Sequence, residues 1–162
     1  MSVLETMKIG ADMNTVWQRA AAYVVALDAQ QRVLLPQFEK KSHPKSGAWT
    51  LPGGGMEWAE EAHETALREL KEETGLYADI GPLLGVQSEW FDERTSDAGQ
   101  RGLALRLVFG VRNCVGELKS DFRDDDTTVG AAWFTIEDVQ QLNRVEVVDF
   151  GLSLVFKENA PF

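Results

Sequence analysis

The sequence predicts an α/β fold in which helices flank a mixed β-sheet. Short apolar runs rich in strand-forming residues are spread along the chain. A long helical pattern stands in the middle, at about residues 59–74, and a more apolar helical pattern, EVVDFGLSLVF, comes near the end. Strands interspersed with helices in this way are typical of a sheet covered by helices.

The length of 162 residues predicts a single domain over 1–162, since domains cluster around roughly 100–150 residues. Residues 1–19 are a weakly patterned lead-in, and 144–162 are expected to form a C-terminal extension or helix. The net charge of −10 argues against binding to a nucleic-acid polymer, because such proteins neutralise phosphates with positive surfaces. A nucleotide substrate remains compatible with this charge if a metal ion lies between the acidic protein and the phosphates.

A single cysteine, Cys114, excludes an internal disulfide, and its strand-like surroundings indicate a packing role rather than a reactive thiol. The start, MSVLETMKIG, lacks the basic and apolar regions of a signal peptide. No apolar run approaches the roughly 18 residues that a membrane span needs. We therefore expect a cytoplasmic protein that does not contact a membrane.

The first half of the chain contains two short strands before the central helix. AAYVVAL at 21–27 and RVLLPQF at 32–38 are joined by the polar turn DAQQ, which predicts a β-hairpin. Residues 39–48 are rich in Lys, Ser, Pro and Gly and are expected to form a loop. WTLPGGG at 49–55 then gives a brief strand and a glycine turn.

The central helix is predicted over 59–74, and Gly75 ends it because glycine tolerates the positive φ needed there. A strand follows at 78–91. Another covers 103–111, where apolar residues alternate onto one face. AAWFT is a short strand, and Thr135 is the expected N-cap of a further helix.

Three carboxylates, Glu69, Glu72 and Glu73, lie close together near the end of the central helix, where like charges repel and the helix dipole disfavours anions. One interpretation is a solvated acidic face, with Arg68 paired to Glu64 and Glu72. At about 100° per residue, however, Glu73 falls on the apolar side of the helix, where an unpaired carboxylate is costly. A hard cation such as Mg²⁺ or Mn²⁺ would remove this difficulty, since it prefers oxygen ligands.

The same segment has a distinctive spacing of fixed residues. These are Gly54, Glu60, Arg68, Glu69, Leu70, Glu72, Glu73, Gly75 and Leu76. Residues 54–76 are similar to the Nudix box, G-x5-E-x7-R-E-U-x-E-E-x-G-U with U apolar, and every defined position is filled. The flanking WTLPGGG and the later AWF strand also resemble the family, over about 20–142. The resemblance implies a Nudix-type α/β/α sandwich and a MutT-like hydrolase that cleaves a diphosphate bond with Mg²⁺ or Mn²⁺.

The resemblance also assigns roles to residues of the box. Glu69, Glu72 and Glu73 match the metal-binding carboxylates, and Glu69 also matches the base of some members. The carbonyl of Gly53 matches a backbone metal ligand. Arg68 resembles the catalytic-site residue that orients the carboxylates.

The chain departs from the family pattern shortly before the helix. Many members have E-P-G-E or similar where this chain has Glu57-Trp58-Ala59-Glu60. Alanine thus replaces a glycine, which puts the conformation of this loop in doubt. Trp58 is either at the rim of the pocket or an indole packed on the surface. Glu60 is expected to have a more structural role.

Two carboxylates outside the box are candidates for an extra base or metal ligand. They are Glu89, in a predicted strand, and Asp126, in an acidic loop whose alternative interpretation is a solvated turn. A metal ion would lower the pKa of a bound water, and a carboxylate would then take its proton.

The substrate is less clear from the sequence. Lys45 and Arg101, in loops, could contact phosphate, and Trp49 could stack on a base, although solvation or core packing also explains them. The first hypothesis is a nucleoside triphosphate or modified nucleotide as the small-molecule substrate. The alternatives are an ADP-ribose or nucleotide-sugar pyrophosphatase and a catalytically silent ligand-binding module. Family resemblance suggests a homodimer, although no residue pattern identifies an interface.

Overall fold

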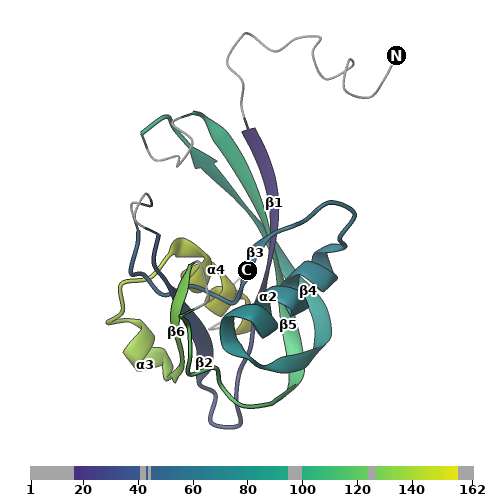
Figure 1. Cartoon of the computed structure of the whole chain (residues 1–162), viewed down its shortest axis with the longest axis vertical. Helices are drawn as coiled ribbons and strands as arrows, with labels where there is room; N and C mark the ends of the chain where they lie inside the picture. Colours follow the sequence, from purple (N-terminus) through teal and green to yellow (C-terminus); the bar gives the residue numbers. More distant parts are fainter. Residues whose placement is uncertain (1–16, 41–42, 44, 95–99, 124–126, 157–162) are drawn as a thin grey trace, which may run out of the picture.

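The computed structural model describes residues 17–40, 43, 45–94, 100–123 and 127–156, within which strands and helices alternate (Figure 1). The elements in chain order are β1 (Trp17–Val25), β2 (Val33–Phe38), β3 (Gly53–Gly55), α2 (Ala62–Thr74), β4 (Tyr77–Phe91), β5 (Gly102–Val115), β6 (Thr128–Phe134), α3 (Ile136–Val139) and α4 (Glu146–Val155).

The strands form two sheets. The larger has the order β3-β1-β5-β4, with β1 parallel to β5 and the other neighbours antiparallel. The smaller is the antiparallel pair β2-β6. The predicted mixed sheet is therefore confirmed.

The two faces of β1 are covered by different helices. Ala22 and Val24 belong to a buried cluster with Leu70 of α2. Val25 points to the other side and belongs to a second cluster with Val148 of α4. Because successive residues of a strand face opposite sides, the large sheet lies between α2 and α4, which confirms the expected layers.

The predicted hairpin of 21–27 and 32–38 is wrong. Asp28 does close a turn, since its Oδ1 accepts hydrogen bonds from the backbone of Gln30 and Arg32. Beyond the isolated bridge between Leu27 and Val33, however, the strands separate into different sheets. An apolar run such as β2, buried on both faces, indicates a strand without identifying its partner.

The central helix begins later than predicted. It starts at Ala62, after the N-cap Glu61, whose capping box with Glu64 satisfies the first backbone N–H groups. Ala59, placed in the helix by the sequence, instead has a φ of 61° in the preceding loop. Gly75 ends the helix with a φ of 80°, as predicted.

The glycine turn predicted after a brief strand in 49–55 is wrong, because Gly53–Gly55 themselves form the strand β3, whereas Trp49 makes only isolated bridges. The other predicted elements are confirmed. The strands β4, β5 and β6 and the helix α4 lie where the patterns placed them. Thr135 caps α3 by accepting a hydrogen bond from the Asp138 backbone N–H at 3.1 Å. Cys114 packs beside the α2 cluster, and burial raises the pKa of its thiol, in agreement with a packing role. No helix in the described ranges is long and apolar enough to cross a membrane.

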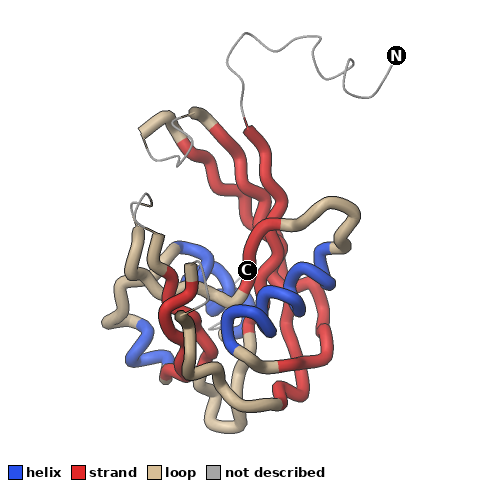
Figure 2. The backbone as a smooth tube through the Cα atoms, in the orientation of Figure 1, coloured by secondary structure: helices blue, strands red, loops and turns tan. Residues whose placement is uncertain are grey.

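One end of the large sheet extends past both helices (Figure 2). At this end the strands β1, β4 and β5 lack a helix over them, so Trp90 and Leu105 are exposed by 72% and 40%. The box helix and the glycine strand β3 lie where this projecting part of the sheet meets the body of the protein (Figures 1 and 2).

Candidate active site

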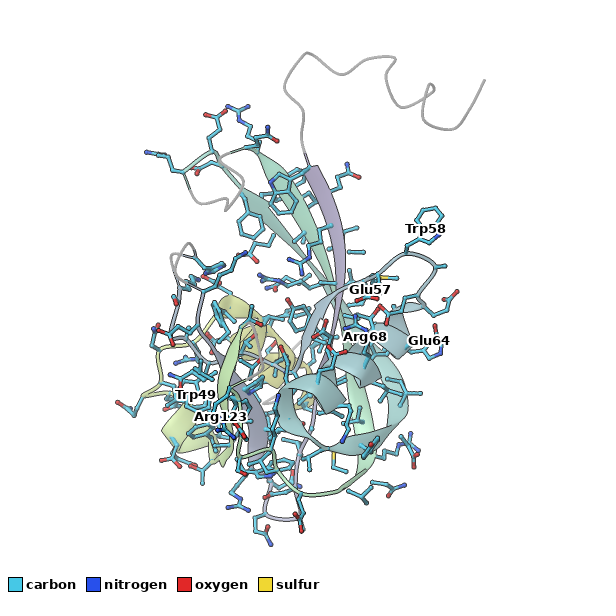
Figure 3. All side chains as sticks on the ribbon, viewed as in Figure 1. Trp49, Glu57, Trp58, Glu64, Arg68 and Arg123 are labelled. Atoms are coloured by element: carbon cyan, nitrogen blue, oxygen red, sulfur yellow. The ribbon has the colours of Figure 1, made fainter. Side chains whose placement is uncertain are left out.

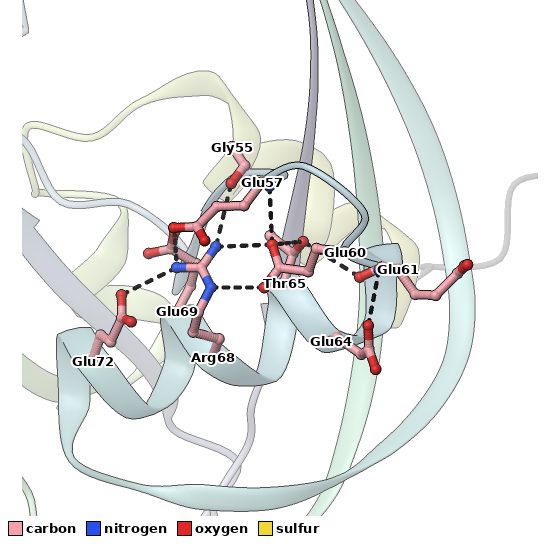
Figure 4. Close-up of polar contacts among 9 residues, drawn as sticks. All are labelled: Gly55, Glu57, Glu60, Glu61, Glu64, Thr65, Arg68, Glu69 and Glu72. Atoms are coloured by element: carbon pink, nitrogen blue, oxygen red, sulfur yellow. Dashed lines mark hydrogen bonds and ion pairs between the residues drawn. The ribbon is translucent and has the colours of Figure 1, made fainter.

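The guanidinium of Arg68 is the centre of a network of carboxylates on α2 and the loop before it (Figure 4). It donates to Glu60 Oε1 and Oε2 at 2.7 and 3.1 Å, through Nε and Nη2. Its Nη1 donates to Glu69 at 2.9 Å and to Glu72 at 3.1 Å. Nη2 also reaches the carbonyl of Gly55 in β3 at 3.4 Å. Arg68 therefore binds two box carboxylates beside the glycine strand.

Glu60 holds the other end of this network. It accepts hydrogen bonds from Thr65 Oγ1 at 2.6 Å and from the Glu57 backbone at 3.0 Å, in addition to those from Arg68. The Arg68 bonds, followed by those of Thr65 and Glu57, lower the pKa of Glu60 from 4.5 to about 2. Glu64 bonds to the Glu61 backbone rather than to Arg68, so the expected Glu64–Arg68 pair is not formed.

Glu73 lies at the outer edge of β3. Its Oε2 accepts a hydrogen bond from the backbone N–H of Gly53 at 2.9 Å. The side is as the helical wheel predicted, since Glu73 is half-buried whereas Glu72 is exposed. The expectation that Glu73 lacks a protein partner is wrong, because the edge strand β3 provides a backbone N–H that donates a hydrogen bond to it. The N–H and C=O of one strand residue point to the same edge, so the Gly53 carbonyl faces the Glu73 side as well.

Glu69 lies directly over Gly54. A Cβ at Gly54 would be 2.6 Å from Glu69 Oε1, so a side chain there would displace the carboxylate. Burial raises the pKa of Glu69, while the hydrogen bond and charge of Arg68 oppose this rise. Glycine in β3 thus allows a partly desolvated carboxylate to approach the strand closely.

A hard divalent cation fits these donors by their chemistry. The candidate ligands are the carboxylates of Glu69, Glu72 and Glu73 and the carbonyl of Gly53, all of them oxygen donors. In the described part of the chain no three ligating side chains already converge on one point. The hydrogen bonds explain why, because Arg68 holds Glu69 and Glu72 while a backbone N–H holds Glu73.

Glu89, a candidate for the extra base, lies on the opposite face of the sheet from α2. It forms an ion pair with Arg106 of β5, and Arg106 Nη1 also donates to Gln87 at 3.4 Å. Both charged side chains are mostly buried, with exposed fractions of 23% and 12%. Arg106 was not among the residues predicted from the sequence, although a charged residue within an apolar alternation could have indicated it.

The proposed substrate contacts in the loops are not brought to the carboxylates. Lys45 forms an ion pair with Glu146 at the start of α4. The ring of Trp49 packs on Phe134, with centroids 4.7 Å apart, and lies well away from Arg68 in Figure 3. Core packing therefore accounts for Trp49 in this structure.

Arg101 lies at the projecting end of the sheet, where its Nε is 3.6 Å from Glu93. It is five residues from Arg106 along β5, which corresponds to about 16 Å at the rise of a strand. Arg101 is therefore distant from the glycine strand β3. Asp126 lies outside the described residues, so its role stays a prediction.

Trp58 points away from the protein, with 99% of its surface exposed (Figure 3). The interpretation as an indole packed on the surface is therefore wrong. Next to it, the left-handed φ of Ala59 explains why glycine suits this position. The loop keeps the conformation of a glycine although it carries alanine.

The sequence comparisons identify the family of the chain. The family model described as NUDIX domain matches residues 17–152. An ADP-ribose pyrophosphatase of Methanocaldococcus jannaschii is 33% identical over 116 residues, 72% of this chain and 62% of the relative. The 8-oxo-dGDP phosphatase of Homo sapiens is 36% identical over 68% of this chain and 30% of the relative. A diphosphoinositol polyphosphate phosphohydrolase of Mus musculus is 34% identical over 75% of this chain and 65% of the relative. The matches thus span less than two thirds of these relatives.

Solved structures show the same fold. A MutT NUDIX hydrolase from Burkholderia pseudomallei superposes with a TM-score of 0.68 and 24% identity, over 85% of this chain and 98% of its own. The MutT protein from Methanosarcina mazei Go1 gives a TM-score of 0.67 and 20% identity, over 90% and 98% of the two chains. With the box residues gathered along β3 and a family match over most of the sequence, this chain belongs to the Nudix family.

Proposed function

We propose that the protein hydrolyses a diphosphate bond in a nucleoside diphosphate derivative, with a divalent cation such as Mg²⁺ as cofactor. The preferred substrate is a nucleoside triphosphate or a modified nucleotide. The family relation supports pyrophosphate chemistry, and the relative that acts on 8-oxo-dGDP supports a modified nucleotide.

The arrangement at the outer edge of β3 carries this proposal. Glu69 lies over Gly54, Glu73 lies at the Gly53 N–H, and Arg68 holds Glu72 close by. A cation bound to these oxygens would neutralise phosphate oxygens and lower the pKa of a bound water. Acidic residues alone would repel a diphosphate, so a cation also explains how such a site could accept its substrate.

The residues of the chain have distinct roles in this scheme. Glu69, Glu72, Glu73 and the Gly53 carbonyl hold the cation. Glu69 is also the favoured base, because burial raises the pKa of its carboxyl and so makes it a better proton acceptor. Arg68 positions Glu69 and Glu72 and has most of its donors occupied by protein groups.

An ADP-ribose or nucleotide-sugar pyrophosphatase is the second candidate. The relative from Methanocaldococcus jannaschii, named for ADP-ribose, favours it. A silent ligand-binding module is less favoured, since all the box carboxylates are present.

Turnover of a substrate panel tests the proposal. The purified protein with Mg²⁺ is given dGTP, 8-oxo-dGDP, ADP-ribose and UDP-glucose, and the released phosphate, pyrophosphate and nucleoside monophosphate are measured. We expect hydrolysis of at least one nucleotide and none in EDTA. Preference for ADP-ribose would select the second candidate. Binding of nucleotide without turnover of any substrate would replace the hydrolase by the ligand-binding module.

A further inference from the structure

Two consecutive glycines of β3 lie against opposite charges. A Cβ at Gly54 would be 2.6 Å from Glu69 Oε1, and a Cβ at Gly55 would be 2.5 Å from Arg19 Nε. Because neighbouring residues of a strand face opposite sides, the Glu69 carboxylate and the Arg19 guanidinium lie on the two faces of β3. The backbone of β3 therefore separates the Arg19 guanidinium from the Glu69 carboxylate.

Within the described part of the chain, Arg19 differs from the other arginines around the site in being held by no carboxylate contact, although its charge is within electrostatic range of Glu69. Its side chain is exposed, and among the residues that the structure describes it makes no hydrogen bond or ion pair. Arg68 and Arg106, by contrast, are both bound to carboxylates. A guanidinium has five N–H donors in a planar arrangement that suits phosphate. Those of Arg19 are available for a ligand.

Tyr23 lies where the face of β3 that carries Arg19 meets the edge of β3 that carries Glu73. This residue, four positions along β1 from Arg19 and on the same face of the strand, lies opposite Gly53. Its hydroxyl is within electrostatic range of Arg19 and Arg106 and also of Glu73, which binds the Gly53 N–H. A ligand held at the edge of β3 beside Glu73 would therefore be close to the charge of Arg19.

We infer that Arg19 binds a phosphate of the substrate on the Tyr23 side of β3 and is a specificity-determining residue for diphosphate compounds. This inference rests on the proposed function, since it assumes that the same edge of β3 binds a diphosphate. Gly55 contributes to the same phosphate site, because a side chain at this position would push the Arg19 guanidinium away from the strand.

The binding of a non-hydrolysable probe tests this inference. We choose α,β-methylene-ADP with Mg²⁺ and measure its affinity by calorimetry for the wild type and for Arg19→Gln. Loss of a charge-assisted hydrogen bond predicts a weakening of about tenfold to a hundredfold. The affinity for adenosine should stay the same, and Arg19→Lys should restore part of the loss. Arg94→Gln, which changes an exposed arginine paired with Asp92, is the matched control and should not weaken binding.

Gly55→Ala provides a second test that leaves residue 19 unchanged. Gly55 does not have a positive φ, so its backbone accepts alanine, and the flexible end of Arg19 must move instead. We expect this variant to weaken the probe as well, and the double variant with Arg19→Gln to add little further loss. If the affinity losses of the two single variants added fully in the double variant, Gly55 and Arg19 would not act on the same phosphate contact.

The affinity for Mg²⁺ provides a further measurement, which would not change if Arg19 had only a structural role. Arg19 is a cation across one strand from Glu69, so Arg19→Gln should strengthen Mg²⁺ binding while it weakens the probe. Wild-type affinity for the probe in Arg19→Gln, or equal losses for the probe and adenosine, would overturn the inference. Failure of the wild type to bind the probe would overturn it too. If the wild type hydrolyses nothing but Arg19→Gln still loses the probe, the hydrolase proposal fails and the inference on Arg19 stands.

Discussion

Arg68 donates to both carboxylate oxygens of Glu60, at 2.7 and 3.1 Å, and thereby joins the loop before α2 to the helix itself. Thr65 and the Glu57 backbone add two further hydrogen bonds to the same carboxylate. Glu60 thus stabilises the fold through its charged form, and its protonation should have a measurable cost.

The first prediction concerns stability in acid. The pKa of Glu60 is about 2 in the folded protein and 4.5 without these contacts. A lowered pKa means that the stabilisation is complete above about pH 4.5 and disappears as the pH falls toward 2. We expect the Tm of the wild type to exceed that of Glu60→Gln at neutral pH and the difference to shrink across this window. A difference that stays constant from pH 5 to pH 2 would contradict the assigned cause.

The second prediction concerns Glu73. In Glu73→Gln the amide oxygen can still accept from the Gly53 N–H, so the fold is retained while the negative charge is lost. We expect kcat to fall by at least a hundredfold, about 2.7 kcal/mol. Glu64→Gln is the control, because a glutamine keeps the capping box on the same helix. A loss below about tenfold, which is roughly 1.4 kcal/mol, would remove Glu73 from the ligand set.

The third prediction concerns the cation itself. A ligand that binds the folded state alone, at a hundred times its Kd, stabilises it by about 2.7 kcal/mol. For a domain of this size that raises the Tm by about 5–10 °C. Mg²⁺ should therefore raise the Tm in a melting experiment, and EDTA should reverse the rise. An equal rise in Glu73→Gln would show that the ion binds elsewhere.

The fourth prediction concerns Ala59, whose φ of 61° is unfavourable for a residue with a Cβ. The left-handed conformation costs about 1–2 kcal/mol for such a residue, whereas glycine adopts it readily. Ala59→Gly should therefore increase the free energy of unfolding by about 1 kcal/mol, after the loss of chain entropy is subtracted. The matched change Ala66→Gly, in the interior of α2, should decrease it by at least about 1 kcal/mol. Denaturant titration measures the free energy of unfolding of both variants. If Ala59→Gly were less stable than the wild type, the backbone at Ala59 would not be strained.

The sequence was sufficient to predict the box helix, its glycine end and the inward position of Glu73. These features depend on contacts between residues that are close in the chain, which a helical wheel represents directly. The start of the helix was predicted three residues too early, because Ala59 favours a helix by composition. The positive φ at this position is imposed by the loop, whose geometry the local pattern does not report.

The features that depend on contacts between distant residues could not be predicted in the same way. The separation of β1 and β2 into two sheets follows from their partners β5 and β6, far along the chain. Arg19 falls in the segment interpreted as a lead-in, and its importance becomes visible only when Gly55 lies against it. The Glu73–Gly53 bond spans 20 residues and likewise requires the fold.

The contacts of β3 have a further consequence for how the protein behaves in solution. β3 is an edge strand, and the side chains of Glu73 and Arg68 occupy its outward N–H and C=O groups at Gly53 and Gly55. Unpaired edges promote strand pairing between molecules, which leads to aggregation. The residues proposed for catalysis therefore also leave this edge with fewer free backbone groups for strand pairing. Truncation of either side chain to alanine would expose this edge, so a loss of activity in such variants has to be separated from self-association.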